Sequence, residues 1–135
     1  MEPQKRHWSR RLALQALYQW QLANHSTEEL LAQYVEDDNW EKADKDYFVD
    51  LVSQSIAEEL NLLEKAQPYL EFPAENIDPI EKAILLLASY EIAHKPETPT
   101  KVILSEAINL CKKFGSTDGY KFINGVLDKI ALSRT

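Results

Sequence analysis

Glycine is scarce in this sequence, with three among 135 residues, and Gly115, Gly119 and Gly125 all lie in one stretch near the carboxyl end. No glycine is available before residue 115 to form the tight turns of β-hairpins, and no alternation of apolar and polar residues between turn signals is present. These absences argue against a β-rich fold. Long apolar runs are missing as well, because none approaches the ~20 residues that span a bilayer.

Cysteine occurs once, as Cys111, so the chain cannot form an internal disulfide. Cys111 lies in a helical apolar pattern, which favours a packed core thiol over a nucleophile. The histidines His7, His25 and His94 are dispersed without the spacing of a chelating pair, and there is no glycine-rich phosphate loop. We therefore expect no metal and no cofactor, and a binding module rather than an enzyme.

Charge is distributed unevenly along the chain. Acidic residues outnumber basic residues by 22 to 15, and a net charge of −7 argues against nonspecific nucleic-acid binding by the whole surface. The first eleven residues are the exception, because Lys5, Arg6, Arg10 and Arg11 stand against a single acid and give this segment about +3. Cations at the start of a helix oppose its dipole, so an anionic ligand, and not folding, favours them there. A solvated tail that only aids solubility is the alternative.

Length and composition indicate one soluble domain, with 44% apolar and 27% charged residues. Apolar residues recur with helical spacing over nearly the whole chain, which predicts an all-α fold of six or seven helices in two packed groups. We expect the groups to be an amino-terminal subdomain, residues 1–70, and a carboxyl-terminal subdomain, residues 78–135, joined by a hinge at 71–77. Nothing in the sequence marks export, so a cytoplasmic protein is expected.

Local signals predict several helix boundaries. Ser26 and Glu29 have the spacing of a capping box, and Asp44 is placed to cap a long helix whose apolar face continues to Leu63. Residues 80–92 are apolar on nearly all sides, which predicts a buried central helix.

The glycines mark a corner between the last two predicted helices. Gly115 is expected to end the first of these helices in the left-handed conformation, and Ser116 or Thr117 to cap the second. Residue type alone favours a core position for Phe122, with stacking on an unpaired base as the open alternative.

Aromatic residues accompany the cations of the basic end. Arg11 and Tyr18 are seven residues apart and share one flank of the first predicted helix. Single-stranded RNA suits cations interleaved with aromatic side chains, whereas no pattern of base-reading residues for duplex DNA is present.

Three stretches of the sequence resemble the NusB family of bacterial transcription antitermination factors. They read RRLALQALYQWQL, IEKAILLLASYEI and KVILSEAINLCKKFGSTDGYKFINGVLDKIA. The resemblance extends over essentially the whole chain and implies two perpendicular groups of three helices. It also implies binding to boxA RNA together with the ribosomal protein NusE. That complex would join other Nus factors on RNA polymerase and suppress premature termination in ribosomal RNA operons.

The resemblance carries over contact residues position by position. The implied RNA-binding residues are Lys5, Arg6, Arg10, Arg11, Gln15, Tyr18, Asp118, Lys121, Phe122 and Asn124. The residues implied to face NusE are Tyr69, Leu70 and Glu81. His7, Trp8 and Ser9 interrupt what is often a denser arginine run in the family, so RNA affinity is expected either to be lower or to depend more on Trp8.

Two other functions compete with this interpretation. An acidic helical adaptor that binds only proteins would leave the basic end without a role. The helical RNA-binding module that is fused to RNA cytosine methyltransferases is less favoured, because no cofactor-binding domain follows in this sequence.

Overall fold

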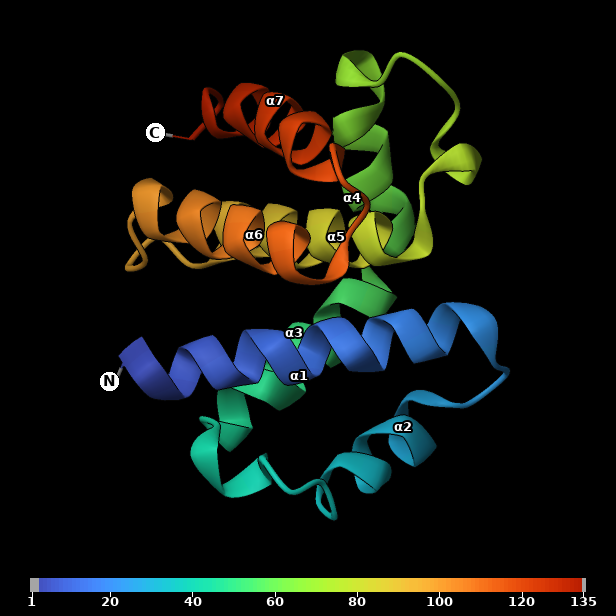
Figure 1. Cartoon of the computed structure of the whole chain (residues 1–135), viewed down its shortest axis with the longest axis vertical. Helices are drawn as coiled ribbons and strands as arrows, with labels where there is room; N and C mark the ends of the chain where they lie inside the picture. Colours follow the sequence, from blue (N-terminus) through green and yellow to red (C-terminus); the bar gives the residue numbers. More distant parts are fainter. Residues whose placement is uncertain (1–2, 135) are drawn as a thin grey trace.

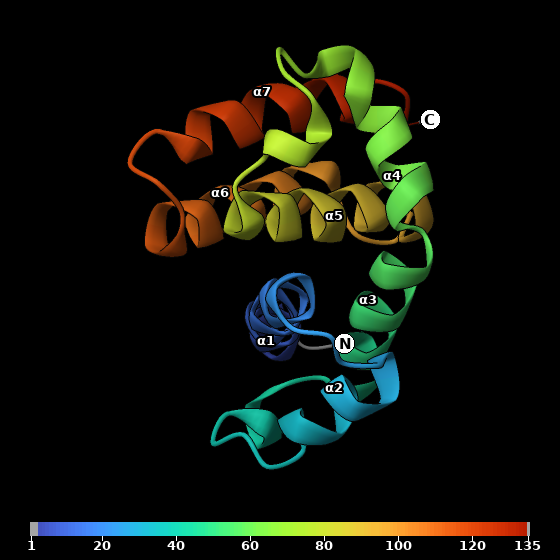
Figure 2. The same cartoon turned by 90° about the vertical axis from the view of Figure 1, so that its right-hand side faces the viewer.

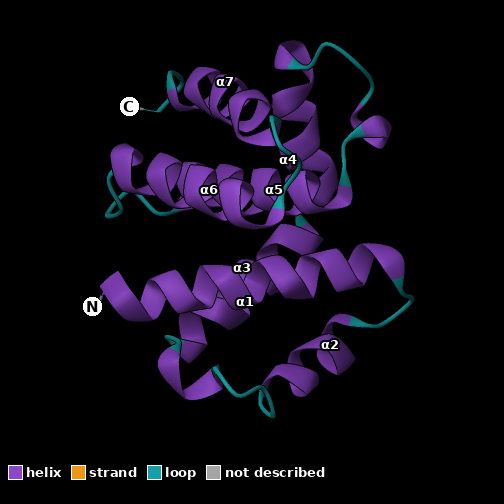
Figure 3. Ribbon diagram, in the orientation of Figure 1, coloured by secondary structure: helices purple, strands orange, loops and turns teal. Residues whose placement is uncertain are grey.

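Seven α-helices and no strands make up residues 3–134, the part of the chain that the computed structural model describes (Figure 3). The helices are α1 (Pro3–Leu22), α2 (Thr27–Tyr34), α3 (Lys45–Ala57), α4 (Glu59–Ala66), α5 (Pro79–His94), α6 (Thr100–Phe114) and α7 (Gly119–Ala131). Short 3-10 turns are η1 (Trp40–Lys42), η2 (Gln67–Tyr69) and η3 (Ala74–Asn76). The all-α prediction is confirmed. Glu2, the acid counted in the basic end, lies outside the described residues. None of the described helices is long and apolar enough to cross a membrane.

The helices form two groups that meet where α1 packs on α5 (Figure 1). The first group contains α1, α2 and α3, and the second contains α5, α6 and α7. α4 leads out of α3 and packs on α5 and α7. Figure 2 shows α1 end-on while α5 and α6 are seen from the side, so α1 crosses the second group. The division into subdomains 1–70 and 78–135, and the hinge at 71–77, stay predictions.

α5 is the central helix, as its composition predicts. Its residues from Ala83 to Ile92 are all buried, and it contacts α1, α3, α4, α6 and α7. A helix that is apolar on all sides must be covered on all sides to remove that surface from water. Three of the buried residues of α5 are polar or charged, Glu81, Ser89 and Glu91, and Glu91 belongs to the ionic network described below.

The predicted helix caps are present where the spacing placed them. The Glu29 backbone N–H donates to Ser26 Oγ and the Ser26 N–H donates to Glu29 Oε1, both at 3.1 Å, which completes the capping box. These backbone and side-chain hydrogen bonds from Ser26 lower the pKa of Glu29. Asp44 accepts the Tyr47 N–H at 3.1 Å and caps α3.

The long helix predicted from Asp44 to Leu63 is interrupted at Glu58, whose φ of −103° and ψ of 13° separate α3 from α4. Side chains at the break are bonded to α5, since Glu58 Oε1 lies 3.0 Å from His94 Nε2 and Glu59 pairs with Lys82 at 2.7 Å. Apolar periodicity continues across the break because both halves pack on α5, so the sequence pattern did not reveal it. α1, with 20 residues, is the longest described helix.

Gly115 does not end α6 in the left-handed conformation. Its φ is −87° and its ψ is −174°, and no glycine among the described residues has a positive φ. Close packing explains the glycine at this position instead, because a Cβ there would lie 2.7 Å from the Cys111 carbonyl oxygen. Cys111 itself is fully buried, as expected for a core thiol. Burial raises the pKa of that thiol to about 11.

Candidate nucleic-acid interface

Arg10 lies in the interior, which corrects the prediction that it holds a phosphate. Its side chain is 5% exposed. Its Nε and one terminal nitrogen donate to the two carboxylate oxygens of Glu91 at 2.8 and 2.9 Å, and the other terminal nitrogen donates to Glu106 at 2.9 Å. Burial alone would lower the pKa of Arg10. The hydrogen bonds and the electrostatic attraction to Glu91 outweigh this effect, so the pKa is raised. The charge is therefore already compensated within the fold.

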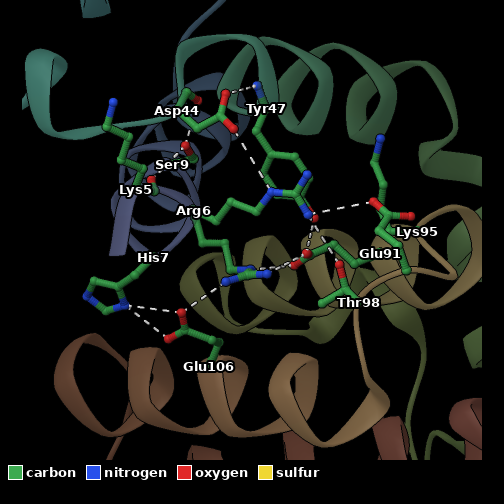
Figure 4. Close-up of polar contacts among 12 residues, drawn as sticks. Lys5, Arg6, His7, Ser9, Asp44, Tyr47, Glu91, Lys95, Thr98 and Glu106 are labelled. Carbon is green, nitrogen blue, oxygen red and sulfur yellow. Dashed lines mark hydrogen bonds and ion pairs between the residues drawn. The ribbon is translucent and has the colours of Figure 1, made fainter. Parts of the chain in front are cut away.

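The Arg10 pairs belong to a network that ties the two helix groups together. Figure 4 labels Tyr47, Glu91 and Glu106, which also belong to it. Tyr47 on α3 donates its hydroxyl to Glu91 on α5, and burial together with this carboxylate raises the pKa of Tyr47. His7 Nδ1 on α1 lies 3.0 Å from Glu106 Oε2 on α6. Four helices thus meet at one set of hydrogen bonds.

Arg6 is also largely engaged within the fold. Its guanidinium carbon lies 4.0 Å from the centre of the Tyr47 ring, and its nitrogens lie 4.0 Å from Asp44 and 3.6 Å from Glu97. One of these nitrogens donates to the Thr98 hydroxyl at 3.4 Å. Lys5, the first predicted cation, is exposed.

Arg11 has surroundings of a different kind. Its guanidinium carbon lies 4.9 Å from the centre of the Trp8 ring and 5.2 Å from that of Phe114, and no carboxylate among residues 3–134 forms an ion pair with it. Lys42 lies 4.7 Å from the same Trp8 ring, and Lys113 lies 5.8 Å from the Phe114 ring. We call these five residues the cation–aromatic surface. It joins α1 to η1 and to the end of α6.

The flank of α1 continues this surface. Gln15 and Tyr18 follow Arg11 at four and seven residues, so the three side chains lie on one face of the helix. Gln15 is exposed, and Tyr18 is 38% exposed. The seven-residue spacing predicts this location for Tyr18, and the family resemblance implies it for Gln15.

The corner between α6 and α7 adds further cations around an aromatic ring. Lys112 and Lys121 lie 4.9 and 5.9 Å from the centre of the Tyr120 ring. Asp118 is exposed and its Oδ1 lies 3.4 Å from Lys121 Nζ. Asn124 is half-buried.

Phe122 is neither fully buried nor free. It is half-buried against the core, and its ring centre lies 5.4 Å from that of Phe72. Both rings line a groove of about 260 Å³ that also includes Tyr69. Tyr69 is 39% exposed, whereas Leu70 is half-buried and packs on the core. Residues implied to face RNA and residues implied to face NusE therefore meet at one groove.

Glu81 is buried, which corrects the prediction that it faces a partner. It is 7% exposed, and its Oε2 accepts the Ser116 N–H at 3.2 Å and the Ser116 hydroxyl at 2.7 Å. A Cβ on Gly119 would lie 2.4 Å from the same oxygen. Neither Ser116 nor Thr117 caps α7, because Asp118 occupies the N-cap position and its side chain forms no capping bond. Through these hydrogen bonds, Glu81 on α5 fixes the position of the corner between α6 and α7.

Residues 3–134 contain no group of three or more histidine, cysteine or acidic side chains placed to hold a metal ion.

The comparison with known families decides the classification. The model of the NusB family matches residues 7–132. This chain belongs to the NusB family.

Relatives of this NusB-family chain share the name transcription antitermination protein NusB. The chain is 45% identical to the protein from Burkholderia lata over 131 residues, which are 97% of this chain and 90% of that one. It is 44% identical to the protein from Burkholderia vietnamiensis over the same shares.

Solved structures agree on the fold. T. maritima NusB is 25% identical with a TM-score of 0.87, covering 96% of this chain and 92% of that chain. A second structure is described as antitermination factors NusB and NusE in complex with dsRNA. It is 24% identical with a TM-score of 0.86, covering 96% and 97% of the two chains.

Two residues of the cation–aromatic surface were not named as candidate contacts from the sequence of this NusB-family chain: Lys42 and Lys113. Lys113 lies near the end of a helix with an ordinary apolar pattern. Lys42 lies in a short turn that only the fold brings to Trp8. The one local signal was Trp8, an aromatic residue placed inside a basic run.

Proposed function

We propose that this chain is a non-enzymatic, cytoplasmic transcription antitermination factor that binds boxA-type single-stranded RNA together with the ribosomal protein NusE. The complex would join other Nus factors on RNA polymerase and suppress premature termination in ribosomal RNA operons. Membership of the NusB family supports this proposal, as does the structural likeness to a NusB that is described in complex with NusE and RNA.

The observation that carries the proposal is the position of Arg11 between Trp8 and Phe114. An aromatic ring attracts a cation by about 0.5–1 kcal/mol at an exposed site but leaves its charge in place. Arg11, Lys42 and Lys113 therefore keep their positive charge on a protein whose net charge is −7. Such a cluster attracts the phosphates of a nucleic acid more readily than any acidic part of the surface.

The same surface offers faces for unpaired bases. Tyr18 continues it along α1, and Tyr120 continues it at the corner. A single strand can place phosphates on the cations and stack bases on exposed rings, whereas a duplex hides its base faces. We assign contact with NusE to Tyr69 and Leu70. We assign Glu81 an indirect role, because its hydrogen bonds to Ser116 hold the corner between α6 and α7 in position for RNA.

The test is a titration of boxA-like single-stranded RNA into the chain, with and without NusE. RNA and NusE should each tighten binding of the other, and linkage requires the two factors to be equal. The logarithm of the binding constant should fall with the logarithm of salt concentration, with a slope of ~0.7 for each phosphate contact. A duplex of the same sequence should bind more weakly.

Matched variants locate the binding surface. Arg11→Gln should lower the salt slope by ~0.7, because one phosphate contact is lost. Lys101→Gln, which removes an exposed cation at the other end of α6, should leave the slope unchanged. Absence of RNA binding with and without NusE would contradict the proposal and favour the adaptor that binds only proteins.

A further inference from the structure

The three glycines differ in what a side chain would meet at each position. A Cβ on Gly115 would lie 2.7 Å from the Cys111 carbonyl oxygen, and a Cβ on Gly119 would lie 2.4 Å from Glu81 Oε2. Both distances are shorter than real contacts, so packing within the chain accounts for these two glycines. A Cβ on Gly125 would meet nothing within 4 Å.

Packing within the folded chain therefore does not explain why residue 125 is a glycine. It lies in the middle of α7, and its φ is not positive. Glycine in a helix interior is less stable than alanine, because it loses more backbone freedom on folding and buries nothing in return. Alanine would fit this exposed position and stabilise the helix. The missing methyl group leaves room for something outside the chain.

The surroundings of Gly125 indicate what that ligand is. Gly125 lies in the 260 Å³ groove between α7 and the segment after α4. Lys121 and Lys129 also line the groove, four residues before and after Gly125, so all three share one face of the helix. Lys129 forms no ion pair with a described residue.

The opposite wall is aromatic. Tyr69 is 39% exposed and Phe72 is 37% exposed, and Phe72 packs on Phe122 with ring centres 5.4 Å apart. Glu71 is the one acidic residue that lines this groove within the described chain. Cations along one wall and exposed rings along the other are the combination that holds a single nucleic-acid strand, with its backbone on the cations and its bases on the rings.

We propose that the RNA strand continues past the corner along α7, with a sugar–phosphate unit packed against Gly125 between Lys121 and Lys129 and its base on the Phe72 side of the groove. The proposal rests on the proposed RNA-binding function and extends its path by Gly125, Lys129 and Phe72. Lys121 connects this segment with the corner described above. A protein segment is the alternative occupant of an aromatic groove, but the two lysines that line this one favour a polyanion.

The decisive variant is Gly125→Ala, which should affect stability and binding in opposite directions. The midpoint of thermal unfolding should rise by about 4 °C, because alanine is the better helix residue. Affinity of the chain alone for boxA-like single-stranded RNA should fall roughly tenfold, because the methyl group occupies the contact. Ser105→Ala, at an exposed position on α6, should leave RNA affinity unchanged.

A second variant separates contact from charge. Lys129→Gln should lower the slope of log K against log salt by ~0.7, whereas Gly125→Ala removes no cation and should leave the slope unchanged. Gly119→Ala provides the opposite control for stability, since its Cβ would clash with Glu81 and should lower the unfolding midpoint.

The other outcomes overturn the inference in distinguishable ways. If the unmodified chain binds no RNA, the proposed function fails and this inference fails with it. If the unmodified chain binds RNA and Gly125→Ala binds it equally well, only the path along α7 is wrong. Loss of NusE binding without loss of RNA affinity would assign the groove to the protein partner. A lower unfolding midpoint for Gly125→Ala would show that the glycine is structural.

Discussion

Arg10 and Arg11 are neighbours in the chain, yet one faces carboxylates and the other faces aromatic rings. Arg10 is buried against Glu91 and Glu106 at distances of 2.8 to 2.9 Å. Arg11 lies over Trp8 and Phe114, with no ion pair to a described residue. Adjacent helix positions point about 100° apart, so the same side chain enters two environments.

Arg10 is thus a structural cation, whereas Arg11 is available to bind an anionic ligand. A carboxylate neutralises the guanidinium, and taking both groups out of water makes either partner costly to remove alone. A ring leaves the positive charge in place and draws an anionic ligand toward it. The charge of the basic end predicted a ligand, but only part of that charge faces solvent.

Replacing the two arginines separately tests this difference between them. Arg10→Gln should lower the free energy of unfolding by about 3–5 kcal/mol, because Glu91 is left buried without its counter-charge. Arg11→Gln should lower it by only about 0.5–1 kcal/mol, because the attraction to the aromatic rings is lost but no buried charge is left unpaired. Urea unfolding at constant pH measures both differences.

Equal loss of stability in the two variants would contradict the distinction. Glu91→Gln serves as the partner control for the buried pair. Together with Arg10→Gln it closes a double-mutant cycle, and the coupling between the two sites should be large because they share hydrogen bonds.

Local patterns predicted much of the fold. The Ser26 capping box, the Asp44 cap and the buried central helix were predicted from patterns within single helices, and all three are confirmed. The break at Glu58 was missed because both α3 and α4 pack on α5, so the apolar periodicity continues across it.

The candidate site was predictable only in part, because partners come from distant segments. Glu91 is 81 residues from Arg10, so no spacing rule could pair them. The exposed position of Tyr18 followed from helical spacing, whereas Gln15 was placed on the same flank by the family resemblance. The burial of Glu81 was missed because Ser116, its partner, is 35 residues away.

Glu81 is a buried acid of a different kind from Glu91, because its hydrogen bonds go to the neutral groups of Ser116. Glu81→Ala should lower the free energy of unfolding by about 1–3 kcal/mol, because the Ser116 N–H and hydroxyl lose their acceptor. Glu81→Gln keeps an acceptor oxygen and should lose less. Thermal unfolding of both variants measures the difference.

Binding separates this positioning role from a direct contact with NusE. If Glu81 acts through the corner, Glu81→Ala should weaken RNA binding, and Glu81→Gln should restore most of it. Equal loss of NusE affinity in both variants, with RNA affinity unchanged, would show instead that the carboxylate itself contacts the partner.

The smallest expected effect is at Asp118, where acid and cation meet in solvent. Asp118 Oδ1 lies 3.4 Å from Lys121 Nζ, and both side chains are more than half exposed, so the pair should add less than about 0.5 kcal/mol to stability. A carboxylate at this corner repels phosphate and partly offsets Lys121. Asp118→Asn should therefore leave thermal unfolding unchanged and tighten binding of boxA-like RNA by a few-fold at low salt, with the gain shrinking as salt screens the charge. Clear weakening would show that Asp118 accepts a necessary hydrogen bond from a base, and would place this exposed acid among the contacts and not among the charges that oppose them.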